Sequence, residues 1–181
     1  SERSDGATRF EHCAAQLGSV SLVCGGGYVI ADPCESSTLL LLAGDEAQWT
    51  QACDLTTDRA CAGGSVVAAT DPSAHRLLIV GGGNYRTPLL DSCELYDVAA
   101  DRWIVQEARL PQAMRCRAAP IASGSAVLAV QSDAERHTKC TLMDVRSNSP
   151  SWQQVATPEM TKTWHALTAV GEHSVVMLGG L

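Results

Sequence analysis

Three arginines recur at one place in the chain and carry chemistry suited to anion recognition. Arg9, Arg59 and Arg115 stand at the start of the first expected strand in three successive units of the sequence. A guanidinium presents its donors in a planar fork, which fits a carboxylate through two parallel hydrogen bonds. The arginines therefore predict a cationic cluster that binds an acidic peptide or protein surface. The alternative interpretation is structural, with each arginine bonding carbonyl oxygens of the neighbouring unit.

Other basic and aromatic side chains fall in segments expected to lie near these arginines. Arginine and histidine would add positive charge, and tyrosine and tryptophan would add the aromatic surface typical of interaction hot spots. The predicted partner-binding residues are Arg9, Arg59, Arg115, Arg117, Tyr85, Arg86, Arg136, His137 and Trp164. We expect these residues to contact a protein or an acidic peptide.

Sequence motifs of common catalytic and metal sites do not occur. The five histidines show no His-x-His or His-x-x-x-His spacing, and no Cys-x-x-Cys pair suggests structural zinc. The glycine runs 25–27 and 81–83 lack the Lys-Ser/Thr of a phosphate loop, and there is no Gly-x-Ser-x-Gly elbow. The sequence therefore predicts a non-enzymatic protein with no catalytic residue, metal or cofactor.

Charge and hydrophobicity limit the classes of partner. Thirteen Lys and Arg against twenty Asp and Glu give a net charge of −7 and a pI near 5.1, which argues against nucleic-acid binding. The longest apolar run, 39–43, is far too short to span a membrane. The first residues do not resemble a signal peptide. We therefore expect a cytoplasmic protein that binds neither nucleic acid nor membrane.

The eight cysteines are widely spaced. They are Cys13, Cys24, Cys34, Cys53, Cys61, Cys93, Cys116 and Cys140. Without a secretory signal we expect mostly reduced thiols packed as small hydrophobic side chains, with disulfides or metal binding as the alternative.

Sequence repeats organise the chain. Trp49, Trp103 and Trp152 lie 54 and 49 residues apart, and each ends a similar segment. The clearest segments are Cys93-Glu-Leu-Tyr-Asp97 and Cys140-Thr-Leu-Met-Asp144. Glycine runs after an apolar stretch recur on the same period, except in the third unit. In the second unit the turn residues predict strands at about 60–69, 76–81, 93–98 and 103–108.

The combination of these features resembles the kelch repeat. Glycines after an apolar strand, then Glu94-Leu-Tyr-Asp97, then Trp103 form the best match. The resemblance extends from about residue 9 to residue 181. It is weakest in the first unit, where Leu-Leu-Ala-Gly stands in place of Glu-Leu-Tyr-Asp. It implies an all-β, kelch-type β-propeller, in which each repeat forms one four-stranded blade.

The repeat boundaries predict three full four-stranded blades plus half a blade. The expected segments are a lead-in at 1–8, blades at 9–55, 56–110 and 111–158, and the first half of a fourth blade at 159–181. The resemblance implies six or seven blades in a closed kelch propeller. We therefore expect part of a larger propeller, with the remainder supplied by the parent chain or another subunit.

The resemblance also implies a function. Loops at one mouth of a kelch propeller recognise a partner protein or peptide, and the innermost strands line the central channel. The leading prediction is a protein–protein interaction module, in some proteins of this kind the substrate-recognition part of a ubiquitin ligase adaptor. One alternative is a scaffold subunit of a cytoskeletal or organellar assembly. Another is a propeller enzyme, an oxidase or sugar isomerase, which would need a Tyr–Cys cross-link with His ligands or a polar cluster in the channel.

Overall fold

The regular structure is entirely β-strand in the part of the chain that the computed structural model describes. The described residues are 11–17, 20–26, 36, 38–42, 48–68, 76–83, 89–132, 138–157 and 165–179. They contain fourteen strands, each four to seven residues long. None of the described segments forms a helix long and apolar enough to cross a membrane.

The strands form three four-stranded antiparallel sheets and one hairpin, each from strands consecutive in sequence. Sheet 1 contains β1 (Cys13–Leu17), β2 (Val20–Cys24), β3 (Thr38–Leu42) and β4 (Trp49–Ala52). Sheet 2 contains β5 (Gly63–Val67), β6 (Arg76–Val80), β7 (Cys93–Asp97) and β8 (Arg102–Val105). Sheet 3 contains β9 (Cys116–Ile121), β10 (Ala126–Ser132), β11 (Thr138–Asp144) and β12 (Trp152–Val155). The hairpin pairs β13 (His165–Val170) with β14 (Ser174–Gly179).

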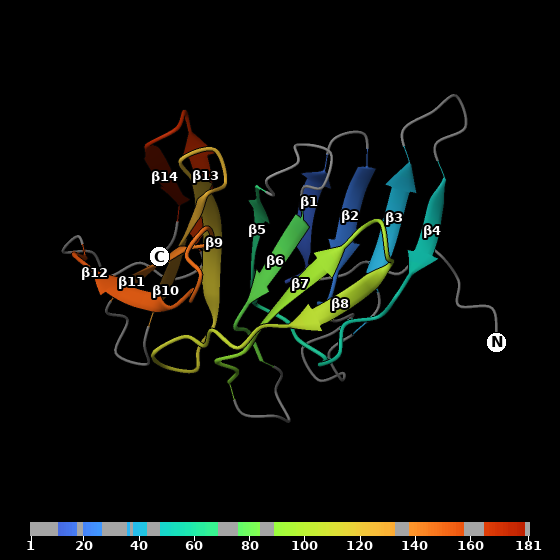
Figure 1. Ribbon diagram of the computed structural model, residues 1–181, viewed down its shortest axis with the longest axis horizontal. Coiled ribbons are helices and arrows are strands. Elements are labelled where there is room, and N and C mark those ends of the chain that lie inside the picture. Colours follow the sequence, from blue (N-terminus) through green and yellow to red (C-terminus); the bar gives the residue numbers. More distant parts are fainter. Residues whose placement is uncertain are drawn as a thin grey trace.

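The sheets lie beside one another with their first strands together. Strand β1 contacts β5, β5 contacts β9, and β9 contacts β13. Sheet 2 lies between sheet 1 and sheet 3 (Figure 1), and later strands of each sheet lie farther from this shared line. The prediction of an all-β chain with four-stranded units is confirmed, and the described strands do not close into a ring.

Strand register confirms the tryptophan repeat. Trp103 faces Tyr96 across the last strand pair of sheet 2, and Trp152 faces Met143 in sheet 3. Trp49 faces Leu41 in sheet 1. The predicted alignment of the first unit is wrong. It placed Leu-Leu-Ala-Gly, residues 41–44, at the position of Glu-Leu-Tyr-Asp. By register, residues 39–42 occupy that position. The predicted alignment missed this shift because the turn before Trp49 is longer than the turn before Trp103.

Two clusters of buried side chains hold the sheets together, and we call them the first seam, between sheets 1 and 2, and the second seam, between sheets 2 and 3. Strand β6 contributes to both, because successive side chains of a strand point to opposite faces. Leu77 and Ile79 enter the first seam, and Leu78 and Val80 enter the second. A sheet covered on both faces explains why this strand is a continuous apolar run.

A predicted glycine turn ends the second strand of sheets 1 and 2. Gly25 and Gly81 have φ values of 63° and 59°, which L side chains rarely adopt. A Cβ on Gly81 would lie 2.7 Å from the carbonyl oxygen of Met114, in the segment that enters sheet 3. The next residue, Gly82, donates its N–H to the same oxygen at 2.9 Å. The turn therefore also joins neighbouring sheets.

Candidate functional site

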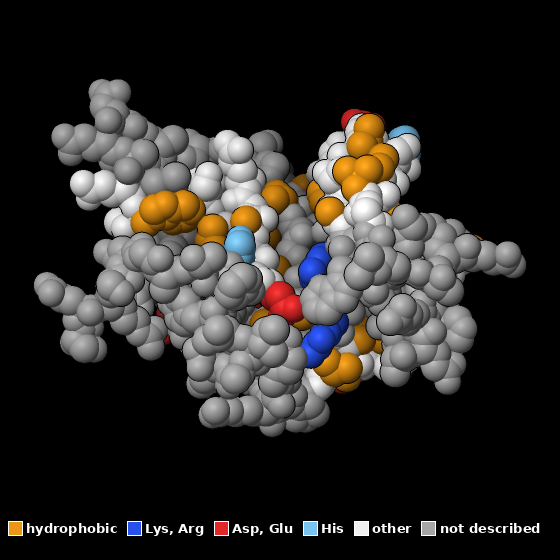
Figure 2. Space-filling view, turned by 180° about the vertical axis from the view of Figure 1, so that it is seen from behind, with side chains coloured by type: hydrophobic (Ala, Val, Ile, Leu, Met, Phe, Trp, Pro, Cys, Tyr) orange, Lys and Arg blue, Asp and Glu red, His pale blue; other side chains and the backbone are white. Residues whose placement is uncertain are grey.

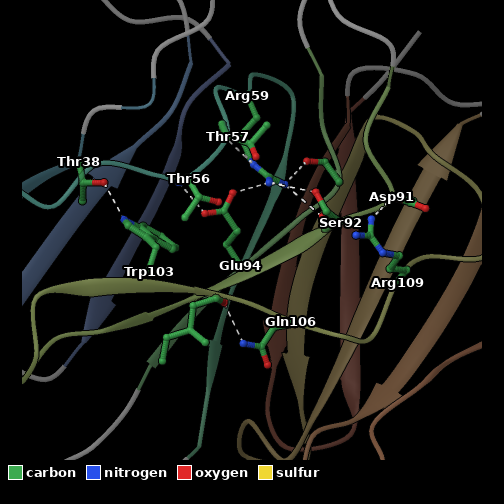
Figure 3. A network of polar contacts seen from close by, with 12 residues as sticks. Thr38, Thr56, Thr57, Arg59, Asp91, Ser92, Glu94, Trp103, Gln106 and Arg109 are labelled. Atoms are coloured by element: carbon green, nitrogen blue, oxygen red, sulfur yellow. Dashed lines mark hydrogen bonds and ion pairs between the residues drawn. The ribbon is translucent and has the colours of Figure 1, made fainter.

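The most extensive polar network in the described structure surrounds Arg59, in the connection between β4 and β5 (Figure 3). Its Nη1 donates to the carbonyl oxygens of Gly81 at 2.8 Å and Ser92 at 3.1 Å. Its Nη2 donates to Oγ of Ser92 at 3.2 Å and to Oε1 of Glu94 at 2.5 Å. The other carboxylate oxygen of Glu94 accepts the backbone N–H of Thr56 at 2.8 Å. Arg59 and Glu94 have exposures of 1% and 0%.

This burial corrects the assignment of Arg59 as a partner-binding residue. The guanidinium is enclosed and its donors are directed at acceptors of the same chain, so it cannot meet a partner in this structure. The structural alternative applies, although the carbonyls belong to its own sheet and not to its neighbour. Gly81 and Ser92 flank the connection that carries Tyr85 and Arg86. Arg59 therefore positions the ends of a predicted binding loop.

Arg115 and Arg117 remain candidates, because both are only partly buried at the start of β9. The predicted equivalence of Arg115 to Arg59 is wrong by strand register. Arg59 lies four residues before Gly63, and Arg115 lies two residues before Arg117, the sheet 3 counterpart of Gly63. Sequence spacing alone could not reveal this, because the connections between sheets differ in length.

Backbone hydrogen bonds gather these two arginines with residues of the other sheets. The N–H of Cys61 donates to the oxygen of Glu11 at 3.1 Å, and the N–H of Cys116 donates to the oxygen of Cys61 at 3.2 Å. Burial raises the pKa of the Cys61 thiol to about 12, with the Glu11 carboxylate adding to the rise and the Arg115 and Arg117 charges opposing it. We call Glu11, Cys61, Arg115 and Arg117 the first-strand cluster. It joins opposite charges where three sheets meet.

A basic and acidic grouping is also visible on the molecular surface. Figure 2 shows Lys or Arg side chains beside an acidic side chain in the central, hollowed part of one face. The other predicted binding residues, namely Arg9, Tyr85, Arg86, Arg136, His137 and Trp164, lie outside the described residues. Among the described residues, no three His, Cys, Asp or Glu side chains form a group that could hold a metal ion.

The first seam contains a second polar network that the sequence did not reveal. The hydroxyl of Tyr96 donates to the carboxylate of Asp101 at 2.6 Å, and the same oxygen accepts the N–H of Cys53 at 2.9 Å. The indole N–H of Trp103 donates to Oγ1 of Thr38 and to the oxygen of Cys53, both at 3.1 Å. The bonds from the N–H of Cys53 and the hydroxyl of Tyr96 lower the pKa of Asp101. Together with the bonds of Trp103, they connect sheet 2 with sheet 1.

The described cysteines are free thiols, and six of the seven are buried, so the prediction that they pack as small hydrophobic side chains is confirmed for those six. Cys53 is exposed. Cys13 donates to the oxygen of Ala62 at 3.0 Å, and Cys116 donates to the oxygen of Val80 at 3.1 Å. These bonds use the protonated thiol. Burial raises the pKa of Cys13 to about 11 and that of Cys116 to about 12.

These raised values predict that the protein loses stability in alkali. The unfolded thiol has a pKa of 9.0, so above this pH the unfolded chain releases protons that the folded chain retains. Each such thiol then lowers the free energy of unfolding by about 1.4 kcal/mol per pH unit, until the folded value is reached. Urea unfolding from pH 8 to pH 11 measures the slope. Cys116→Ala should reduce it, and a slope equal to that of the native chain would contradict the assignment.

Comparisons with known proteins give a likeness of fold. The sequence matches no protein-family model and no curated protein. One similar solved structure is a fungal alcohol oxidase of the AA5 family, determined in complex with copper, with a TM-score of 0.56 and 15% sequence identity. The match covers 68% of this chain and 27% of that one, so the chain spans about a quarter of the length of its structural neighbour. The likeness concerns the fold alone.

Proposed function

We propose that the chain forms part of a kelch-type β-propeller that acts as a protein–protein interaction module. Three features support a propeller: consecutive four-stranded antiparallel sheets, first strands that contact one another, and a tryptophan from sheets 2 and 3 buried in the preceding seam. Each sheet then corresponds to one blade. The hairpin β13–β14 corresponds to the first half of a fourth blade.

The observation that carries the proposed function is the pair Arg115 and Arg117 in the first-strand cluster. Both are partly exposed, although the chain as a whole has a net charge of −7. The described contacts of Arg117 use one donor, which bonds the oxygen of Cys116 at 3.2 Å, so other donors of its guanidinium can meet a carboxylate. We infer that an acidic segment of a partner protein binds at the first-strand cluster.

Reversal of charge at Arg115 tests this function. Binding of a fluorescein-labelled hexaglutamate peptide, followed by fluorescence anisotropy, should weaken at least tenfold in Arg115→Glu because one attraction becomes a repulsion. Arg102→Glu is the matched control, since Arg102 is exposed on β8 outside the cluster and the net charge changes equally. Equal affinities of the two variants would contradict the proposal. Unchanged urea midpoints would show that the loss is not caused by unfolding.

The other roles predicted from the sequence remain proposals. An adaptor of a ubiquitin ligase, a scaffold subunit and a cytoplasmic location are compatible with this binding function. An oxidase is the second candidate function, because the similar fungal structure is that of an alcohol oxidase. Tyr96, the one tyrosine among the described residues, has its ring 4.9 Å from that of Trp103 and donates to Asp101, so in this structure it acts in packing.

A further inference from the structure

A groove of about 460 Å³ lies between sheets 2 and 3, and the proposed function does not use it. Its apolar surface includes Leu78, Leu95, Ile104 and Met143. Half-exposed Val105 stands on its rim. All of its lining residues belong to the described structure. Of these side chains, Leu95 and Ile104 are partly exposed in the groove, whereas Leu78 and Met143 are buried beneath them.

The two seams differ at the repeat position of Tyr96. At the first seam Tyr96 packs on Trp103 and its hydroxyl bonds Asp101, which in turn holds the N–H of Cys53 in sheet 1. At the second seam the corresponding residue, by register, is Met143, opposite Trp152. Methionine has no hydroxyl and cannot make the corresponding bridge. The second seam consequently lacks this hydroxyl bridge between neighbouring sheets.

The tryptophan of the second seam is also less completely bonded. The indole N–H of Trp103 has two oxygen acceptors, one of them Oγ1 of Thr38. Trp152 is buried, and its Nε1 has no oxygen acceptor in the described structure. Cys93 takes the register position of Thr38, and its sulfur is only a weak acceptor for the indole. The second seam thus lacks the tyrosine–aspartate bridge of the first, and its indole has only a weak sulfur acceptor in place of two oxygens.

Opposite charges mark the two ends of the groove. Arg76 lies at one end, level with Arg102 by register. Its side chain is 40% exposed, and its Nη2 lies 3.7 Å from Oδ2 of Asp97. Glu107 lies at the other end, five residues beyond Arg102, which corresponds to roughly 16 Å along a strand. Glu107 is exposed and has no ion pair among the described residues. An extended ligand of about six residues matches this length.

We propose that the groove binds an extended segment of a partner protein with one aliphatic side chain between a basic and an acidic residue. The aliphatic side chain contacts Leu95, Ile104 and Met143. The basic residue pairs with Glu107, and the acidic residue pairs with Arg76. This site lies on the side of the molecule between two sheets, apart from the first-strand cluster. Experiments on this site therefore test it independently of the proposed acidic-peptide site.

Peptide titrations of the 181-residue chain test the site. The probe is the acetylated and amidated hexapeptide Lys-Ser-Leu-Ser-Ser-Glu, and the readout is the NMR shift of the Ile104 and Met143 methyl groups. We expect saturable shifts of both methyls. Replacing the leucine of the peptide by serine should weaken binding at least tenfold, because burial of the leucine side chain is lost.

Charge exchange at the rim tests the orientation of the ligand. Glu107→Lys should weaken binding of this peptide about threefold to fivefold, the range of an exposed ion pair. The same variant should bind Glu-Ser-Leu-Ser-Ser-Glu more tightly than the native chain does. Asp58→Lys is the matched control, since Asp58 is exposed and does not line the groove. It should leave both affinities within twofold.

Three results would overturn the assignment. The first is the absence of methyl shifts at Ile104 and Met143 with the leucine peptide. The second is equal weakening by Glu107→Lys and Asp58→Lys, which would mean that only net charge matters. The third is a shift of the same methyls on raising the protein concentration without peptide, because a second copy of the chain would then occupy the groove.

Discussion

Glu94→Ala is expected to lower the free energy of unfolding by about 3–5 kcal/mol, as breaking a buried ion pair does. The substitution would leave the guanidinium of Arg59 buried with an unpaired charge, since both residues are almost fully enclosed. It would also leave the N–H of Thr56 without its acceptor. Urea unfolding followed by tryptophan fluorescence measures the change. Because most domains have only about 5–15 kcal/mol of stability, much of the native population could be lost at 37 °C.

The matched control is an exposed ion pair between an arginine and a carboxylate. Asp91 and Arg109 approach to 2.7 Å, but their side chains are 42% and 56% exposed. Asp91→Ala should therefore cost less than about 1 kcal/mol. The double variant Arg59→Met with Glu94→Leu removes both charges and should recover a large part of the loss. A cost for Glu94→Ala no greater than that for Asp91→Ala would contradict the account of the network.

The sheet pattern was predictable from the sequence because it depends on neighbours along the chain. Alternating or continuous apolar runs and a positive φ at Gly81 are local properties, and they repeat wherever the unit repeats. The repeated tryptophans were recognisable for the same reason. One misplacement, at residues 39–42, arose where the turn length changes before Trp49. Insertions of this kind shift register without leaving a compositional signal.

The sites were less predictable because they depend on contacts between units. The sequence positions of Arg59 and Arg115 do not distinguish a buried arginine from a partly buried one. By register Arg115 lies two residues closer to its strand than Arg59 does. In addition, Glu94 has Thr141 as its counterpart in sheet 3, a residue that cannot form an ion pair. The groove of the second seam similarly depends on Met143 in place of Tyr96. These differences between repeats become interpretable only after the register is known.

Trp103→Ala is expected to be among the most destabilising single substitutions in the chain, costing about 3–5 kcal/mol. The side chain is buried in the first seam, packs against Tyr96 and donates to Thr38 and Cys53. Its loss would leave a cavity between sheets 1 and 2 and two acceptors without their donor. Trp152→Ala should cost less, because Trp152 is equally buried but has no oxygen acceptor. Urea unfolding followed by circular dichroism measures all variants with one probe.

Trp49→Ala completes this series, since Trp49 occupies the same register position in sheet 1 but is 50% exposed. In the isolated chain it should cost no more than about 1 kcal/mol. If Trp49→Ala instead costs as much as Trp103→Ala, the outer face of sheet 1 must be covered in solution. A dependence of that cost on protein concentration would assign the cover to a second copy. In a complete propeller the preceding blade would cover Trp49, so the small cost expected here should rise to that of Trp103→Ala in the closed assembly.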